Sequence, residues 1–140
     1  MGRILAIDFG TKRTGIAVTD PLRIVPGALR TVATHELPAF LADYMGREPV
    51  DIIVVGYPTN MNGEESASMK QIRPFVEKLK KQYPDKQVVM FDERFTSVIA
   101  QRVILDSGIG KMARRNKALV DEISATIILQ SYMDSKQYVK

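Results

Sequence analysis

A nearly continuous apolar run at residues 50–55 constrains the fold of this 140-residue chain more than any other segment. Only Asp51 interrupts it, so the run has no polar face to expose to water. A strand with apolar side chains on both faces must be covered on both, which is typical of a parallel strand between two layers of helices. The run therefore predicts an α/β architecture with a central sheet.

Further elements alternate around this run. Short apolar segments predict strands at residues 3–9, 14–19, 28–33 and 87–91, and helical spacing predicts helices at about 36–47, 66–83, 97–106 and 116–134. The first two strands are joined by a tight turn and should form a hairpin. Pro74 predicts a kink or a break in the second helix. This order indicates a mixed sheet, antiparallel at first and parallel afterwards, in one domain spanning residues 1–140.

Composition excludes some classes of protein and leaves others open. Hydrophobic residues make up 45% and charged residues 26% of the chain, which is close to the globular average. There is no cysteine, and Asp8 interrupts the first apolar run too early for a secretory signal. No segment reaches the roughly 20 apolar residues that span a membrane, so we expect a soluble cytoplasmic protein. The net charge of +4 permits a polyanionic partner without requiring one.

Asp8 is the first candidate for chemistry. It ends an apolar strand that should be central, and a buried carboxylate is usually paired or bound to a cation. Alternatively, Asp8 caps the turn that follows by accepting hydrogen bonds from the amides of Gly10 to Lys12. That turn also carries Lys12 and Arg13, which suit a phosphate oxygen.

A second acidic cluster, Asp92-Glu93-Arg94, follows the strand at residues 87–91. Open α/β sheets usually place their sites at this carboxyl end of the strands. Adjacent side chains on a strand point to opposite faces, so only one of the two acids should face a given site. The longer Glu93 is the favoured candidate and Asp92 the alternative, while Arg94 could bind phosphate or pair with an acid. The cluster could also be a solvated strand end.

Asp121 is the third candidate, on the last helix. Its position shares a helix face with the apolar residues Ala125, Ile128, Leu129 and Tyr132. An acid in line with such a face is out of place unless a cation meets it. Pairing with Lys117, or with the helix dipole, is the simpler alternative.

A basic run precedes this helix and contains no acid. Its members are Lys111, Arg114, Arg115 and Lys117. Such a run beside carboxylates could bind a phosphate backbone, although charge runs are commonly just solvated.

Three carboxylates on separate elements are typical of metal-assisted phosphoryl chemistry. Carboxylates suit Mg²⁺ or Mn²⁺, and ions held this way can activate water and stabilise a leaving oxygen. A zinc centre is not expected, because His35 is the only histidine and cysteine is absent. The same scarcity excludes a Ser-His-Asp or Cys-His site that does not involve His35.

Four short motifs, in order along the chain, resemble those of the YqgF/RuvX family. They are Asp8-Phe9-Gly10 with Arg13 and Gly15-Ile16-Ala17-Val18; Gly56-Tyr57-Pro58 with the loop at 60–63; Asp92-Glu93-Arg94-Phe95-Thr96-Ser97; and Lys117, Asp121 and Ala125 with Ile128-Leu129-Gln130. The resemblance implies a ribonuclease H-like fold, with a five-stranded mixed sheet flanked by helices. It also implies a bacterial cytoplasmic nuclease that matures the 5′ end of pre-16S ribosomal RNA, in a family with an older label of Holliday junction resolvase-like. By position, the implied catalytic and metal-binding acids are Asp8, Glu93 and Asp121.

The sequence departs from related RuvC-type resolvases at two positions. Those enzymes place their second acid at the end of the fourth strand, where this chain has Gly56. They also carry a further acid in the last helix, where this chain has Ser124, so the number of metal ions is open.

Other functions remain possible at this point. A DNA junction nuclease would use the same acids and would need a symmetric dimer, whereas an RNA nuclease could be a monomer or weak homodimer. An actin-like or sugar-kinase-like ATP-binding protein would share the motif at residues 7–11 but needs a second such domain. A non-catalytic nucleic-acid-binding factor would need the basic run but not the acids.

Overall fold

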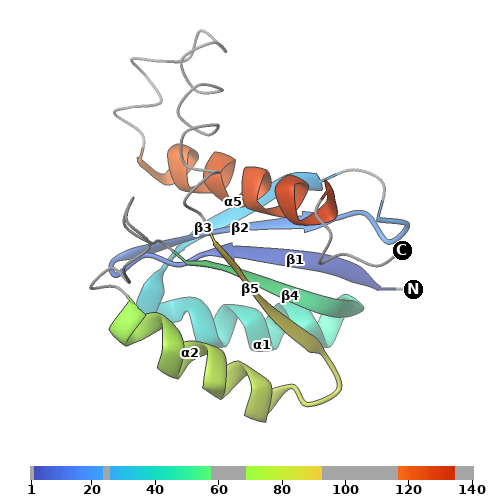
Figure 1. The fold of residues 1–140 in the computed structure, drawn as a ribbon, viewed down its shortest axis with the longest axis horizontal. Helices are drawn as coiled ribbons and strands as arrows, with labels where there is room; N and C mark the ends of the chain where they lie inside the picture. Colours follow the sequence, from blue (N-terminus) through green and yellow to red (C-terminus); the bar gives the residue numbers. More distant parts are fainter. Residues whose placement is uncertain (1, 24–25, 58–68, 93–116, 135–140) are drawn as a thin grey trace, which may run out of the picture.

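The sheet has five strands and is mixed, as predicted (Figure 1). The computed structural model describes residues 2–23, 26–57, 69–92 and 117–134, with only the backbone for residues 117–122. The strands lie in the order β3-β2-β1-β4-β5. Their bounds are β1 Arg3–Asp8, β2 Arg13–Thr19, β3 Pro26–Ala33, β4 Val50–Tyr57 and β5 Gln87–Asp92. The β1–β2 and β2–β3 pairs are antiparallel, and β4 runs parallel to both β1 and β5.

The apolar run that opened the sequence is β4, and it lies between β1 and β5. Ile53 and Val55 pack into a core on one face of the sheet, while Ile52 and Val54 pack into a second core on the other. Both faces of β4 are therefore buried, which explains why its sequence shows no alternation.

Helices cover both faces of the sheet (Figure 1). α1 (Leu37–Arg47), which follows a short 3₁₀ turn at Thr34–Glu36, and α2 (Met69–Gln82) cover one face. α5 (Lys117–Asp134) covers the other through four buried side chains. These are Ala125, Ile128, Leu129 and Tyr132, the apolar face predicted from their spacing. The helix predicted at about 97–106 lies outside the described residues.

Pro74 does not break α2, so that part of the prediction is wrong. The helix continues from Met69 to Gln82 with Pro74 inside it and exposed. A proline inside a helix costs about 3 kcal/mol or more through a lost hydrogen bond and a clash with the preceding turn. Burial of Met69, Ile72, Val76 and Leu79 against the sheet offsets that cost, because each buried side chain contributes about 1.5–3 kcal/mol.

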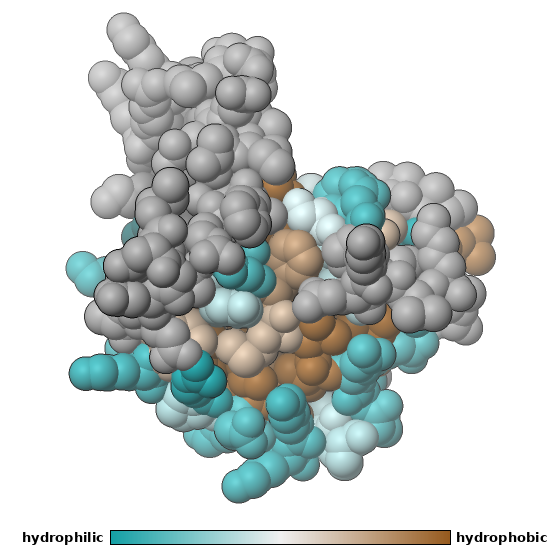
Figure 2. All heavy atoms as spheres, in the orientation of Figure 1, coloured by the Kyte–Doolittle hydropathy of each residue, from teal (hydrophilic) through white to brown (hydrophobic). Residues whose placement is uncertain are grey.

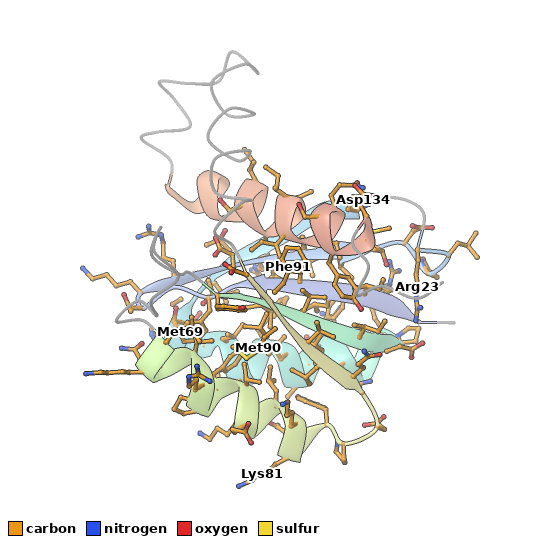
Figure 3. The ribbon with its side chains drawn as sticks, viewed as in Figure 1. Arg23, Met69, Lys81, Met90, Phe91 and Asp134 are labelled. Carbon is orange, nitrogen blue, oxygen red and sulfur yellow. The ribbon has the colours of Figure 1, made fainter. Side chains whose placement is uncertain are left out.

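The direction of α5 is antiparallel to β1. Figure 1 shows β1 running from the N-terminus towards the end of the sheet at which α5 begins, and Figure 3 labels Asp134 at the opposite end of the helix. The first turns of α5 therefore lie at the end of the sheet where β1 terminates. None of the helices in the described ranges is both long and apolar enough to cross a membrane.

Candidate metal centre

Asp8 is the last residue of β1, the middle strand of the sheet, and is half-buried. Its partner in β2 is Gly15 and its partner in β4 is Gly56. Residues directly opposed in a sheet point to the same face, so the side chains nearest Asp8 on both sides would come from these two positions. Both are glycines, so neither neighbouring strand places a side chain directly beside the carboxylate. Gly56 thus lies beside Asp8, at the position where the RuvC-type enzymes carry an acid.

The carboxylate of Asp8 belongs to the α5 face of the sheet. Ile4 and Ala6, which precede it on the same side of β1, pack in the core beneath α5. Ile7 belongs to the opposite core, and Phe9 packs against that core. A ligand bound by Asp8 would therefore lie between the end of β1 and the start of α5.

The turn after Asp8 is held by a threonine from outside the hairpin. The Thr34 hydroxyl donates to the Gly10 carbonyl at 2.6 Å, and the Thr34 amide donates to the Lys12 carbonyl at 2.9 Å. The Thr14 hydroxyl lies 3.0 Å from that of Thr34 and must be the donor, since Thr34 has already used its single hydroxyl hydrogen. Sequence reasoning missed Thr34, because nothing in its local sequence marks it as a partner of residue 10. Thr14, a buried hydroxyl on a strand, was the available signal.

Lys12 and Arg13 project from this turn and are exposed. Because the turn joins the end of β1 to the start of β2, both side chains lie at the same end of the sheet as Asp8. Two cations at this end of the sheet can bind the oxygens of a phosphate group that lies next to the Asp8 carboxylate.

Gly10 tolerates no side chain. A Cβ there would contact the carbonyl oxygen of Arg13 in the same turn, closer than any real Cβ contact. We expect Gly10→Ala to lower the free energy of unfolding by about 1–3 kcal/mol, measured by urea denaturation, because the turn must shift to relieve the overlap. Gly46→Ala is the control, since a Cβ there meets nothing within 4 Å. Replacing that helical glycine by alanine should raise the free energy of unfolding by about 0.5–1 kcal/mol. Equal effects at the two positions would show that the turn adapts freely.

Asp92 ends β5 on the opposite face of the sheet from Asp8. It pairs with Tyr57, which packs against the core beneath α1 and α2. Phe91, one residue earlier, pairs with Gly56 and contacts Tyr132 of α5 at a ring-centroid distance of 6.4 Å. Figure 3 shows Phe91 on the α5 side of β5 and Met90 on the α2 side. The sheet therefore separates Asp92 from Asp8.

The remaining predicted residues are only partly covered by the structure. Glu93, Arg94, Lys111, Arg114 and Arg115 lie outside the described residues. Positions 117 and 121 lie in the first turns of α5, and their side chains are not described. Within the described ranges, no three His, Asp or Glu side chains are grouped so that they could hold a metal ion, and the side chains of Glu93 and Asp121 lie outside those ranges.

The strand order, the antiparallel start of the sheet and the acid ending its middle strand define a ribonuclease H-like α/β fold. A family model described as "RuvX: Holliday junction resolvase" matches residues 2–135. The chain belongs to the RuvX family, as the motifs predicted.

Curated relatives cover almost the whole chain. A protein of Porphyromonas gingivalis named "Putative pre-16S rRNA nuclease" is 64% identical over 96% of this chain and 98% of its own length. Proteins with the same name from Phocaeicola vulgatus and Flavobacterium johnsoniae are 58% and 50% identical, each over 99% of this chain and 100% of their own length. A solved structure, YeaZ from Pseudomonas aeruginosa, aligns at 20% identity and a TM-score of 0.45 over 77% of this chain and 50% of its own. The family assignment rests on the sequence matches alone.

Proposed function

We propose that this protein is a metal-dependent endonuclease that processes the 5′ end of pre-16S ribosomal RNA. The observation that carries the proposal is the carboxylate of Asp8 at the end of the middle strand, with a glycine on each side where a cation and a phosphate need room. The names of the relatives, 50–64% identical over nearly the whole chain, support rRNA precursor as the substrate. A protein that acts on this substrate would work in the cytoplasm. Residues 1–140 would form its single nuclease domain.

Glu93 is the second acid of the proposed site. Asp92 lies on the α2 face, so it does not share a face with Asp8. One further residue of strand alternation predicts the side chain of residue 93 on the α5 face, where Asp8 lies. This reasoning favours Glu93 over Asp92, as did its longer side chain and the family resemblance.

Asp121 is the third acid. Position 121 precedes the buried Ala125 by four residues, one helical turn, so its side chain is expected in line with the sheet-facing side of α5. α5 begins at the end of the sheet where β1 terminates (Figure 1), and Asp8 is the last residue of β1.

The acids suit Mg²⁺ or Mn²⁺, because hard cations prefer carboxylate oxygens. When bound, such an ion supplies a more acidic water and stabilises negative charge on the leaving oxygen. The protein's own part is to hold the ion through Asp8, Glu93 and Asp121. Basic side chains would hold the phosphates on either side of the reacting bond. These are Lys12, Arg13, Arg94, Lys111, Arg114, Arg115 and Lys117.

The test of this proposal is a parallel cleavage assay. Labelled precursor rRNA and a labelled four-way DNA junction are each incubated with the protein in Mg²⁺ and in Mn²⁺. We expect a discrete cut at the 5′ side of the 16S sequence and little cleavage of the junction. No cleavage of the RNA under either metal would contradict the proposal.

A DNA junction nuclease is the second candidate, favoured by the description of the matching family model. Resolving a junction needs two coordinated cuts and therefore a symmetric dimer. Paired symmetric nicks in the junction, from a protein that sediments as a dimer, would favour this candidate. A monomer or weak dimer that cuts only the RNA would favour the first.

The basic run before α5 should contribute to RNA binding. We expect the double change Arg114→Ala and Arg115→Ala to weaken binding and to flatten the salt dependence of log K, by about 0.7 for each lost phosphate contact. The measurement is fluorescence anisotropy over a range of salt concentrations. The control pair is Arg30→Ala with Arg47→Ala, two exposed arginines on β3 and α1. An unchanged slope in the test pair would remove the run from the binding surface.

A further inference from the structure

A groove runs between α1 and α2, on the face of the sheet opposite α5. It consists of two adjoining hollows of 540 Å³ and 320 Å³ that share four lining residues, Pro38, Phe75, Lys78 and Lys81. Phe9 lines only the larger hollow and Tyr83 only the smaller one. We call this surface the α1–α2 groove. Each hollow is within the size range of pockets that hold small organic groups.

The floor of the groove is apolar and aromatic. Phe75 lines both hollows and is half-buried, and its ring lies 5.0 Å from that of Phe9 at an interplanar angle of 35°. The hydroxyl of Tyr83 is buried without a hydrogen-bond partner in the described part of the chain. A flat aromatic surface of this kind can stack on a nucleobase whatever its sequence.

The rim of the groove is basic. Lys78 and Lys81 are exposed, and neither forms an ion pair with any described residue. Among the residues that the structure describes, Glu77 is the only acid that lines either hollow. The whole of α2 carries the same excess, with Lys70, Arg73, Lys78, Lys80 and Lys81 against Glu77. Figure 2 shows hydrophilic side chains projecting along α2, and Figure 3 shows Lys81 pointing away from the helix. The groove therefore combines stacking surface with unpaired positive charge.

The α1–α2 groove is adjacent in the chain to the candidate metal centre. Phe9 follows Asp8 directly in the chain, but the two residues belong to opposite faces of the sheet. Asp8 faces α5, whereas Phe9 lines the groove. An RNA strand bound at Asp8 would therefore need to pass only to the next residue of the protein, Phe9, to enter the groove.

We propose that the α1–α2 groove binds single-stranded RNA next to the cleaved bond, with a base stacked on Phe75 and phosphates on Lys78 and Lys81. The proposal rests on the proposed function, since it extends the binding site of that RNA. An acidic peptide would match the lysines, but it would use neither the aromatic floor nor the continuity with Asp8.

The test is the affinity of a labelled single-stranded RNA of about 12 nucleotides, a length within the range of known single-strand sites. Anisotropy is measured in EDTA, so no cleavage occurs. We expect Lys81→Glu to weaken binding about tenfold through the lost phosphate contact. Phe75→Leu, which keeps an apolar side chain but removes the ring, should weaken it at least about fivefold. Both variants should keep the circular dichroism spectrum of the parent protein.

Lys80→Glu is the matched control, because it makes the same charge change on the same helix at an exposed residue that does not line the groove. Equal losses for Lys80→Glu and Lys81→Glu would overturn the proposal, since general electrostatics would then explain both. Displacement of the RNA by polyglutamate as effectively as by unlabelled RNA would also overturn it. Weaker binding by the groove variants, in a protein that cleaves no precursor RNA, would support the groove while rejecting the proposed catalysis. Normal RNA cleavage by a protein whose groove variants bind unchanged would do the reverse.

Discussion

Asp8→Asn is expected to reduce cleavage of precursor RNA at least about a hundredfold, at saturating Mg²⁺ or Mn²⁺. The amide keeps the shape of the side chain but removes its negative charge, so a cation beside Gly15 and Gly56 loses its central ligand. Metal ions contribute several kcal/mol to transition-state stabilisation, and each 1.36 kcal/mol is tenfold in rate. The measurement is the single-turnover rate on labelled precursor rRNA, with urea denaturation alongside it to show that the variant remains folded.

Asp43→Asn is the matched control for this change. Asp43 is an exposed carboxylate on α1 that pairs with Arg47, one helical turn away, so its replacement makes the same chemical change far from the site. We expect its cleavage rate to stay within about twofold of the parent, since exposed pairs of this kind contribute little. If Asp8→Asn cleaves as fast as Asp43→Asn, the protein does not use Asp8 for catalysis. A non-catalytic RNA-binding factor would then be the better description.

The second large effect is expected from Glu93→Gln, compared with Asp92→Asn. Glu93→Gln should lower the single-turnover rate at least about a hundredfold, for the same reason as at Asp8. Asp92→Asn should change it much less, because Asp92 lies beside Tyr57 on the α2 face and cannot share a metal ion with Asp8 across the sheet. The two residues are neighbours in the chain, so they differ little in position along the strand. A difference between the two variants would therefore report on the face of the sheet to which each side chain points.

A reversed order would show that the alternation of β5 does not continue past Asp92. In that case Asp92→Asn would abolish cleavage and Glu93→Gln would be mild. A raised Mn²⁺ requirement in Glu93→Gln is a useful second measurement, because a weakened metal site can be partly rescued by more metal, whereas a misfolded protein cannot.

Much of the fold was predictable because its signals are local. Strand alternation, the apolar run at residues 50–55 and the helical spacing around Ile128 each follow from which side chains must be buried together. The same local reasoning failed at Pro74. There the cost of an interrupted helix is local, but the burial that offsets it comes from packing against the sheet.

The candidate site was predictable only in part, because its members come from different elements. The sequence identified Asp8, but it did not show that Gly15 and Gly56 lie on either side of it. It also gave no indication that the Thr34 hydroxyl donates a hydrogen bond to the Gly10 carbonyl and so stabilises the turn. These two residues are 24 positions apart in the chain. Strand register creates these neighbours, and register depends on how the whole sheet assembles.

By itself, the sequence determined the five strands, the helices around residues 36–47, 66–83 and 116–134, and the family, since each follows from residue types and their spacing. It also identified the candidate acids and cations for binding a phosphate. Only the tertiary structure decided that Asp8 and Asp92 lie on opposite faces of the sheet. It separated Asp92 from Asp8, placed the start of α5 at the end of β1, and brought α1 and α2 together over Phe9 to form a groove. The physical reason is that pairing and packing across the chain set these positions, and a local pattern cannot specify its distant partners.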